Sequence, residues 1–145
     1  MRTKEFLRKL EHHRIVSAIQ DAELKSSGQI RVHIQRGKLE GDALPAAQKK
    51  FHALKMHNAS ERNAVLIFVA PRAHKFAVVG DQAIHQKCGE ELWQRLVDQM
   101  RAHFRSENFT DALVEAIQEI GKVLAEHFPG KHRGGNELPD TITET

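Results

Sequence analysis

The clearest pattern along the chain is AVLIFVA at Ala64–Ala70, a run in which every residue is apolar. A strand that is apolar on both faces lies in the centre of a sheet that is covered on both sides. A short polar turn separates this run from a second predicted strand at Lys75–Val79, so the two strands can form a hairpin. The segment IRVHI at 30–34 alternates apolar and polar residues, which predicts a half-buried strand.

Four other segments carry apolar residues at the three- and four-residue spacing of an amphipathic helix. We expect helices at Lys4–Lys25, after Asp42, from Gln82 onward and after Thr110–Asp111; the third begins as a short piece that ends at Cys88. Side-chain oxygens at Asp42 and Thr110–Asp111 can cap the helices that follow them. The predicted buried stripes are Ile15, Ala18, Ile19 and Ala22; Ala43, Ala47, Phe51 and Leu54; Leu92, Trp93, Leu96, Val97, Met100 and Phe104; and Leu113, Ile117, Ile120 and Leu124.

The order of the predicted elements is α-β-α-β-β-α-α. We therefore expect an α/β fold, a three-layer α/β/α sandwich with helices on both faces of a small mixed sheet that contains a hairpin. One domain is expected over residues 4–129. Residues 130–145 are polar and rich in glycine, and we expect them to form a mobile C-terminal tail.

Composition and apolar run lengths are typical of a soluble protein. Hydrophobic residues make up 40% of the chain and charged residues 28%. The N-terminal segment carries charges at helical spacing, unlike a secretory signal, and no apolar run approaches the roughly 20 residues that cross a bilayer. A single cysteine, Cys88, excludes an internal disulfide and fits a reducing compartment. We expect a cytoplasmic protein without a transmembrane segment.

Several kinds of partner and chemistry lack a sequence signal. The net charge is only +3, and no stacking aromatic residues alternate with the basic ones, so we expect no nucleic-acid partner. No glycine-rich phosphate loop is present, and we expect no nucleotide cofactor. His85 and Cys88 could share a helix face, but no second ligand pair has a zinc spacing, so we expect no zinc. Gln94 stands where a thiol phosphatase needs arginine after its cysteine.

Gly80 and Asp81 follow the second strand of the predicted hairpin. A carboxylate at a strand end can act as a metal ligand or as a general acid or base in a crevice. An aspartate at this position can also be the N-cap of the helix that begins near Gln82. The two interpretations are compatible, and the sequence leaves both open.

Glu61, Arg62 and Asn63 directly precede the central strand. The side-chain oxygens of Glu61 and Asn63 are ligands that hard cations prefer, and Arg62 could hold an anion. In an antiparallel hairpin the start of one strand and the end of the next lie at the same edge of the sheet. We therefore expect Glu61 and Asn63 to lie close to Asp81, the alternative being a charged loop in water.

Several segments together resemble the TPM domain family, and the resemblance covers residues 6–142. The segments are SSGQIRVHI, ERNAVLIFVAP, HKFAVVGDQAI, HFPG and GNELPD. The resemblance implies a three-layer α/β fold. It also implies a range of activities, because some relatives look like acid phosphatases, some bind divalent cations such as calcium, and others assist membrane protein complexes. Arg62, Asn63, Gly80 and Asp81 match the family pattern.

Two residues depart from that pattern. Ala64 and Ala83 stand where the family usually has glycine. An added Cβ obstructs a close backbone approach and disfavours a positive φ. If those glycines shape a ligand loop, the site in this chain is narrowed or lost.

Two functional hypotheses follow from these observations. In the first, the crevice at the strand ends binds a divalent cation, Ca²⁺ or Mg²⁺, or a phosphorylated ligand, and its enzymatic extension is phosphate-ester hydrolysis. The predicted metal ligands are Asp81, Asn63 and Glu61, and the predicted ligand-binding residues are Arg62 and Gly80. In the second, the domain is a non-catalytic protein-interaction module that assists a membrane-associated complex. The segment Asn136–Asp140 of the tail would then contact a protein partner or the domain itself.

Overall fold

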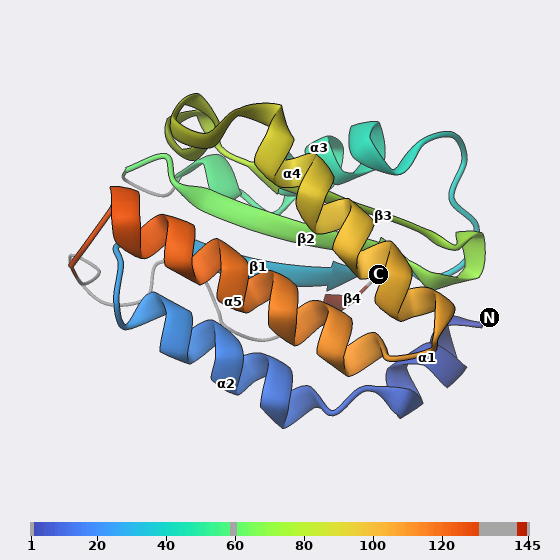
Figure 1. Cartoon of the computed structure of the whole chain (residues 1–145). Helices are drawn as coiled ribbons and strands as arrows, with labels where there is room; N and C mark the ends of the chain where they lie inside the picture. Colours follow the sequence, from blue (N-terminus) through green and yellow to red (C-terminus); the bar gives the residue numbers. More distant parts are fainter. Residues whose placement is uncertain (1, 59–60, 131–141, 145) are drawn as a thin grey trace.

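A mixed sheet with the strand order β3-β2-β1-β4 forms the middle layer of the molecule (Figure 1). This computed structural model describes residues 2–58, 61–130 and 142–144. Strand β1 (Gln29–Ile34) is parallel to β2 (Ala64–Ala70), and β2 is antiparallel to β3 (Lys75–Gly80). Strand β4 (Thr143–Glu144) lies parallel to β1 at the opposite edge from β3. The three predicted strands and the hairpin are confirmed.

Helices cover both faces of the sheet. They are α1 (Thr3–Lys9), α2 (His12–Glu23), α3 (Ala43–Ala53), α4 (Gln82–Arg105) and α5 (Phe109–His127), with 3-10 turns η1 (Met56–Asn58) and η2 (Pro71–Ala73). Apolar residues of α1, α2, α4 and α5 form one core with alternate residues of the strands, such as Val32 and Ile67. Helix α3 packs on the other face, where Phe68 contacts Ala43 and Ala47. The chain is therefore the expected three-layer α/β/α sandwich (Figure 1).

Strand β2 lies between β1 and β3, and all seven of its residues are buried, as its apolar pattern predicts. The prediction of a half-buried β1 is wrong, because all six of its residues are buried as well. Its polar residues face the layer that contains α3. Arg31 is 9% exposed, and burial lowers the pKa of its guanidinium. The apolar residues of β1 therefore face one covered side of the sheet and its polar residues face the other, so neither side of the strand is exposed to solvent.

The N-terminal region forms two helices where the sequence predicts one. The chain leaves the helical conformation at Leu10, which has φ −81° and ψ 135°. Tertiary contacts explain the break: Phe6 packs on the rings of Phe104 and Phe109, and Leu10 is buried in the same core. The N–H of Glu11 donates to a side-chain oxygen of α5, at Thr110. This hydrogen bond to a distant residue takes the place of the backbone hydrogen bond that the N–H of Glu11 would make in a continuous helix.

The helix caps differ from the prediction. Asp42 occupies the N-cap position of α3, but its side chain makes no cap hydrogen bond. Helix α5 begins after Asn108, two residues earlier than expected, and Thr110 lies inside its first turn. The predicted stripe of α5, which includes Leu113 and Ile117, is buried. Helix periodicity therefore located the buried faces better than the helix ends.

Helix α4 contains a kink at Gly89, where the short and long pieces predicted from the sequence meet. Gly89 has φ 68° and ψ −174°, a conformation that is essentially restricted to glycine. No described atom lies within 4 Å of a Cβ built at this position. We therefore expect Gly89→Ala to reduce the free energy of unfolding by about 2 kcal/mol through backbone strain alone.

Chemical denaturation of the wild-type chain and of Gly89→Ala checks this prediction. Gln99→Ala, an exposed position in the regular part of α4, is the matched control and should change stability by less than about 0.5 kcal/mol. A Gly89→Ala variant as stable as the wild type would mean that the kink relaxes at no cost.

The tail expected over residues 130–145 is partly described. Thr143 and Glu144 form strand β4, and Ile142 packs against the main core. The side chain of Glu144 forms an ion pair with Arg36. Residues 131–141 and 145, and with them the predicted contact segment Asn136–Asp140, lie outside the described residues. Within the described part of the chain, no helix is both long and apolar enough to cross a membrane.

Candidate functional site

The hairpin places the end of β3 beside the start of β2. Val65 lies opposite Gly80 in the register of the two strands, and the N–H of Asp81 donates to the carbonyl oxygen of Ala64 at 2.9 Å. Asp81 and the residues that precede β2 therefore share one edge of the sheet. This is the arrangement that the predicted hairpin implied.

Asp81 is paired with Arg62 through both of its carboxylate oxygens. Arg62 Nε donates to Oδ2 at 2.7 Å, and Nη2 donates to Oδ1 at 2.9 Å. The hydrogen bond to Asp81 raises the pKa of the Arg62 guanidinium. Asp81 is 6% exposed, whereas the Arg62 side chain is 40% exposed, so the pair joins a buried acid to a base at the surface. This geometry is that of a bidentate arginine–carboxylate pair.

The same carboxylate caps helix α4. Oδ1 of Asp81 accepts a hydrogen bond from the N–H of Gln82 at 2.8 Å. The N-cap interpretation of Asp81 is therefore confirmed, and the metal-ligand interpretation stays a prediction. Because the cap and the ion pair use the same side chain, Asp81 links the start of α4 to the segment before β2.

The backbone of Arg62 is held in an uncommon conformation. Its φ is 53°, in the left-handed region that few residues other than glycine adopt. Its carbonyl oxygen accepts the N–H of Ala83 at 3.0 Å, so the first turn of α4 holds this backbone in place. A residue kept in this region by its surroundings is a reason to consider a functional role, because such conformations occur often at binding sites.

The other two predicted oxygen ligands have different surroundings. Asn63 is buried, and its side-chain amide donates to Ser27 Oγ at 3.1 Å, which connects the start of β2 to the segment before β1. Glu61 is exposed. Among the described residues, no hydrogen bond joins either side chain to Asp81. Of these three residues, Arg62 hydrogen-bonds to the Asp81 carboxylate, and Glu61 and Asn63 do not.

A cation at this edge would compete with Arg62. Ca²⁺ or Mg²⁺ would need the carboxylate oxygens of Asp81, and the guanidinium already holds both. In the described part of the chain, no group of three or more His, Cys, Asp or Glu side chains could hold a metal. The residues in this arrangement therefore do not fit a divalent cation unless Arg62 moves away from Asp81.

Gly80 has a packing role that the sequence did not reveal. A Cβ at this position would overlap Cζ2 of the Trp93 ring and lie 2.6 Å from Cη2. The ring is held in place, because Trp93 Nε1 donates to His85 Nδ1 at 2.9 Å. The absence of a side chain at Gly80 lets the indole lie directly against β3.

The two alanines that replace family glycines are accommodated without backbone strain. Ala64 lies in β2 and Ala83 in the first turn of α4, and neither is among the described residues with a positive φ. The conformational objection to a side chain at these positions therefore does not apply.

Sequence reasoning missed the pairing of Arg62 with Asp81. The signal was available, because the register argument that places Asn63 near Asp81 applies equally to Arg62, one residue earlier. The positive φ of Arg62 could not be predicted from the sequence, because it depends on the hydrogen bond between the Arg62 carbonyl and the N–H of Ala83.

The fold and this edge can be compared with known proteins. The chain matches the family model of the TPM domain over residues 1–123. The chain belongs to the TPM domain family. The TPM-domain chain is also similar to the BA42 protein of the psychrophilic bacterium Bizionia argentinensis, whose solution structure superimposes with a TM-score of 0.83. The two sequences are 38% identical over 93% of this chain and 92% of the other. No curated protein matches the chain.

Proposed function

We propose that this TPM domain binds a phosphorylated ligand at the edge of the sheet where Arg62 meets Asp81. The observation that carries the proposal is the bidentate pair between a buried carboxylate and an exposed guanidinium. Asp81 holds Nε and Nη2, and a guanidinium has five N–H donors. The remaining donors are in a fork of fixed orientation that suits two phosphate oxygens.

Asp81 is a positioning residue in this proposal. It fixes the plane of the Arg62 guanidinium and removes part of the rotational freedom that an exposed arginine would lose on binding. The strained backbone of Arg62 supports the same role, because a relaxed backbone would direct the side chain elsewhere. Phosphate-ester hydrolysis is the enzymatic extension of this proposal.

A titration with phenyl phosphate, followed by ¹H–¹⁵N NMR spectra, tests the proposal. We expect saturable shifts at the Nε–H of Arg62 and at the amides of Gln82 and Ala83. Arg62→Gln should abolish them, because the fork is lost. Asp81→Asn should weaken binding several-fold, because the arginine remains but is less well oriented. Arg14→Gln, an exposed arginine paired with acidic residues elsewhere, is the matched control and should bind like the wild type.

The same variants distinguish phosphate binding from the binding of a divalent cation, which is the second candidate ligand at this edge of the sheet. If Asp81 binds a cation, chelator-treated wild-type chain should be stabilised by millimolar calcium or magnesium, and Asp81→Asn should lose that response. Arg62→Gln should increase it, because the carboxylate is no longer occupied. This cation pattern, together with no response to phenyl phosphate, would contradict the proposal.

A protein-interaction role is a second candidate function. One observation favours it: the end of the tail pairs with β1, where Thr143 hydrogen-bonds to His33 and Glu144 to Arg36. An extended segment is therefore already bound at one edge of this sheet. A partner that assists or belongs to a membrane-associated complex would bind elsewhere on the domain, and the opposite edge is where we look for it.

A further inference from the structure

Strand β3 forms an edge of the sheet, and no described strand pairs with its outer side. Hydrogen bonds in an antiparallel pair alternate between residues, and the bond from Asp81 N–H to the Ala64 carbonyl sets the phase. The backbone groups of Phe76, Val78 and Gly80 therefore point away from β2. An edge strand of this kind is a template for the addition of another strand.

A cavity of about 1190 Å³ lies along this outer edge. Leu44 and Gln48 of α3 line one side, Gln94 and Val97 of α4 line the other, and β3 forms the floor. In Figure 1, β3 runs between these two helices. The volume exceeds the roughly 300–1,000 Å³ of most small-molecule sites. Leu44 is 49% exposed, which is unusual among the large apolar residues of the described chain, so one wall is an uncovered apolar surface.

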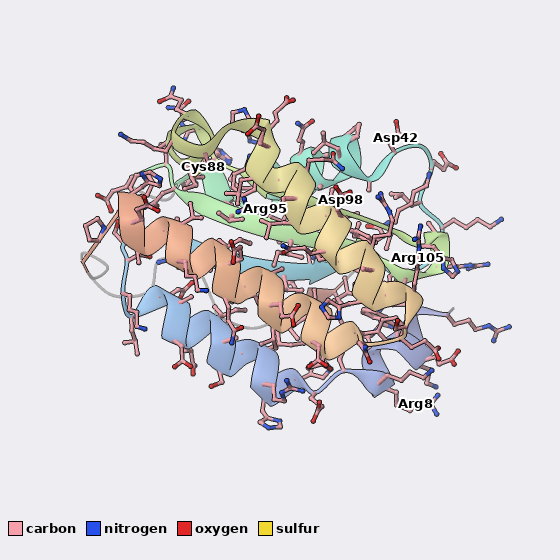
Figure 2. All side chains as sticks on the ribbon, viewed as in Figure 1. Arg8, Asp42, Cys88, Arg95, Asp98 and Arg105 are labelled. Carbon is pink, nitrogen blue, oxygen red and sulfur yellow. The ribbon has the colours of Figure 1, made fainter. Side chains whose placement is uncertain are left out.

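Helix α4 runs antiparallel to β3 along this groove. The ring of Phe104 packs on Phe76 near the start of β3, and Trp93 packs on Gly80 at its end. Figure 2 shows Cys88 and Arg105 at opposite ends of α4. The two ends of the groove are therefore lined by different parts of the helix.

The two ends of the groove carry opposite charge. Lys75, Arg101 and Arg105 line the end near the start of β3, where Arg101 lies 5.9 Å from the centre of the Phe76 ring. Glu107 also lines this end, but its carboxylate is paired with Lys9, so basic groups predominate there. Glu90 and Glu91 line the end near Gly80. A segment bound along the edge would be oriented by these charges.

We propose that this groove binds an extended peptide segment of a partner protein, which adds a strand antiparallel to β3. The peptide donates to and accepts from the outward backbone groups of β3, and its alternate side chains contact Leu44 and Val97. Its N-terminal end carries a basic residue that faces Glu90 and Glu91. Its C-terminal end carries an acidic residue that faces the cluster of Lys75, Arg101 and Arg105. The proposal goes beyond the Arg62 site and does not depend on it.

The walls of the groove favour a peptide over a second copy of this chain. Helices α3 and α4 both line the cavity beside β3, so the edge is flanked by a helix on each side. A second copy would bring its own α3 and α4 to the same edge. An isolated extended segment has no helices of its own that would have to fit beside α3 and α4.

The experiment is selection of a displayed library of random eight-residue peptides against the immobilised full chain. We expect the enriched peptides to alternate apolar and polar residues, with an acidic residue toward the C-terminal end. Leu44→Asp and the double variant Arg101→Glu/Arg105→Glu should each weaken binding of an enriched peptide at least fivefold. Arg95→Glu is the matched control, because Arg95 lies on the same helix, outside the groove, and pairs with Glu119. It should change binding less than twofold.

NMR spectra of the enriched peptide complex show whether a strand is added. The amides of Phe76, Val78 and Gly80 should shift and exchange more slowly with solvent than in the free chain. Arg62→Gln should leave peptide binding unchanged, so failure at one site is distinguishable from failure at the other. The proposal is overturned if no peptide is enriched, or if enriched peptides bind the groove variants like the wild type. A free chain that sediments as a dimer, with these amides already protected, would assign the groove to a second copy.

Discussion

Replacing Gly80 with alanine is expected to reduce the free energy of unfolding by about 3 kcal/mol, at the upper end of the usual cost of overpacking. The new Cβ would overlap the ring of Trp93, and it would lie 3.0 Å from Cγ2 of Ile84. Neither neighbour can move freely, because both are buried and the indole is hydrogen-bonded to His85. Urea or guanidinium denaturation of the two chains measures the difference.

Two controls separate this steric effect from other causes. In Gly28→Ala the Cβ would meet the side-chain carbons of Leu124 at 2.7 and 2.8 Å. Leu124 is buried too, but the contact is with the terminal carbons of a leucine and not with a rigid, hydrogen-bonded indole, so we expect a smaller loss. In Gly80→Ala/Trp93→Leu the ring is absent, and the added cost of the alanine should largely disappear, which a double-mutant cycle detects. An alanine at Gly80 that costs nothing in the wild-type background would show that the indole does not pack on β3 as described.

Stability is expected to fall by about 3 kcal/mol between pH 6.5 and pH 4 because of His33 alone. The His33 side chain is fully buried, and desolvation, with a smaller effect of the charges of Lys50 and Arg31, lowers its pKa from 6.5 to about 4. Between these two values the unfolded chain binds a proton that the folded chain does not. The contribution is therefore fully present above pH 6.5 and is lost as the pH falls to about 4.

The His33 ring contacts both neighbouring strands, β4 through Thr143 and β2 through Phe68. The Thr143 hydroxyl donates to the carbonyl oxygen of Val32 at 3.3 Å, so it accepts from His33 Nδ1 at 2.7 Å. The imidazole also stacks on Phe68, at 5.9 Å between ring centres. Because Thr143 belongs to β4, this histidine joins the end of the tail to the sheet.

Unfolding free energies of the wild-type chain and of His33→Gln, measured from pH 4 to pH 7.5, check the prediction. The difference between the two should depend on pH only in the window from about 4 to 6.5. Gln99→Ala, at an exposed position with no titratable group, is the control and should keep the wild-type slope. Parallel curves for the wild type and His33→Gln would show that His33 titrates normally.

The hydrophobic pattern by itself determined the strands and the covered faces of the helices. The run Ala64–Ala70 is apolar at every position, and only a central strand buries both of its faces. The stripe of α5, which includes Leu113 and Leu124, has helical spacing that no strand could bury on one side. Apolar residues recur at the spacing of a strand or a helix within one segment of the chain. The buried face of that segment can therefore be predicted without knowing which element packs against it. The common sheet edge of Asn63 and Asp81 follows in the same way, because a short turn allows one hairpin register.

Features that depend on distant residues were decided only by the tertiary structure. Helix α1 ends before Leu10 because the aromatic core accepts Phe6 and Leu10 together. His33 is buried, although the polar residues of β1 suggest a solvent face, because its ring stacks on Phe68 of β2 and hydrogen-bonds to Thr143 of β4. Arg62 reaches Asp81 because the carbonyl of Arg62 is fixed by the first turn of α4. In each case the partner is far away in the sequence, and a local pattern carries no information about which distant surface will exclude water or offer a hydrogen bond.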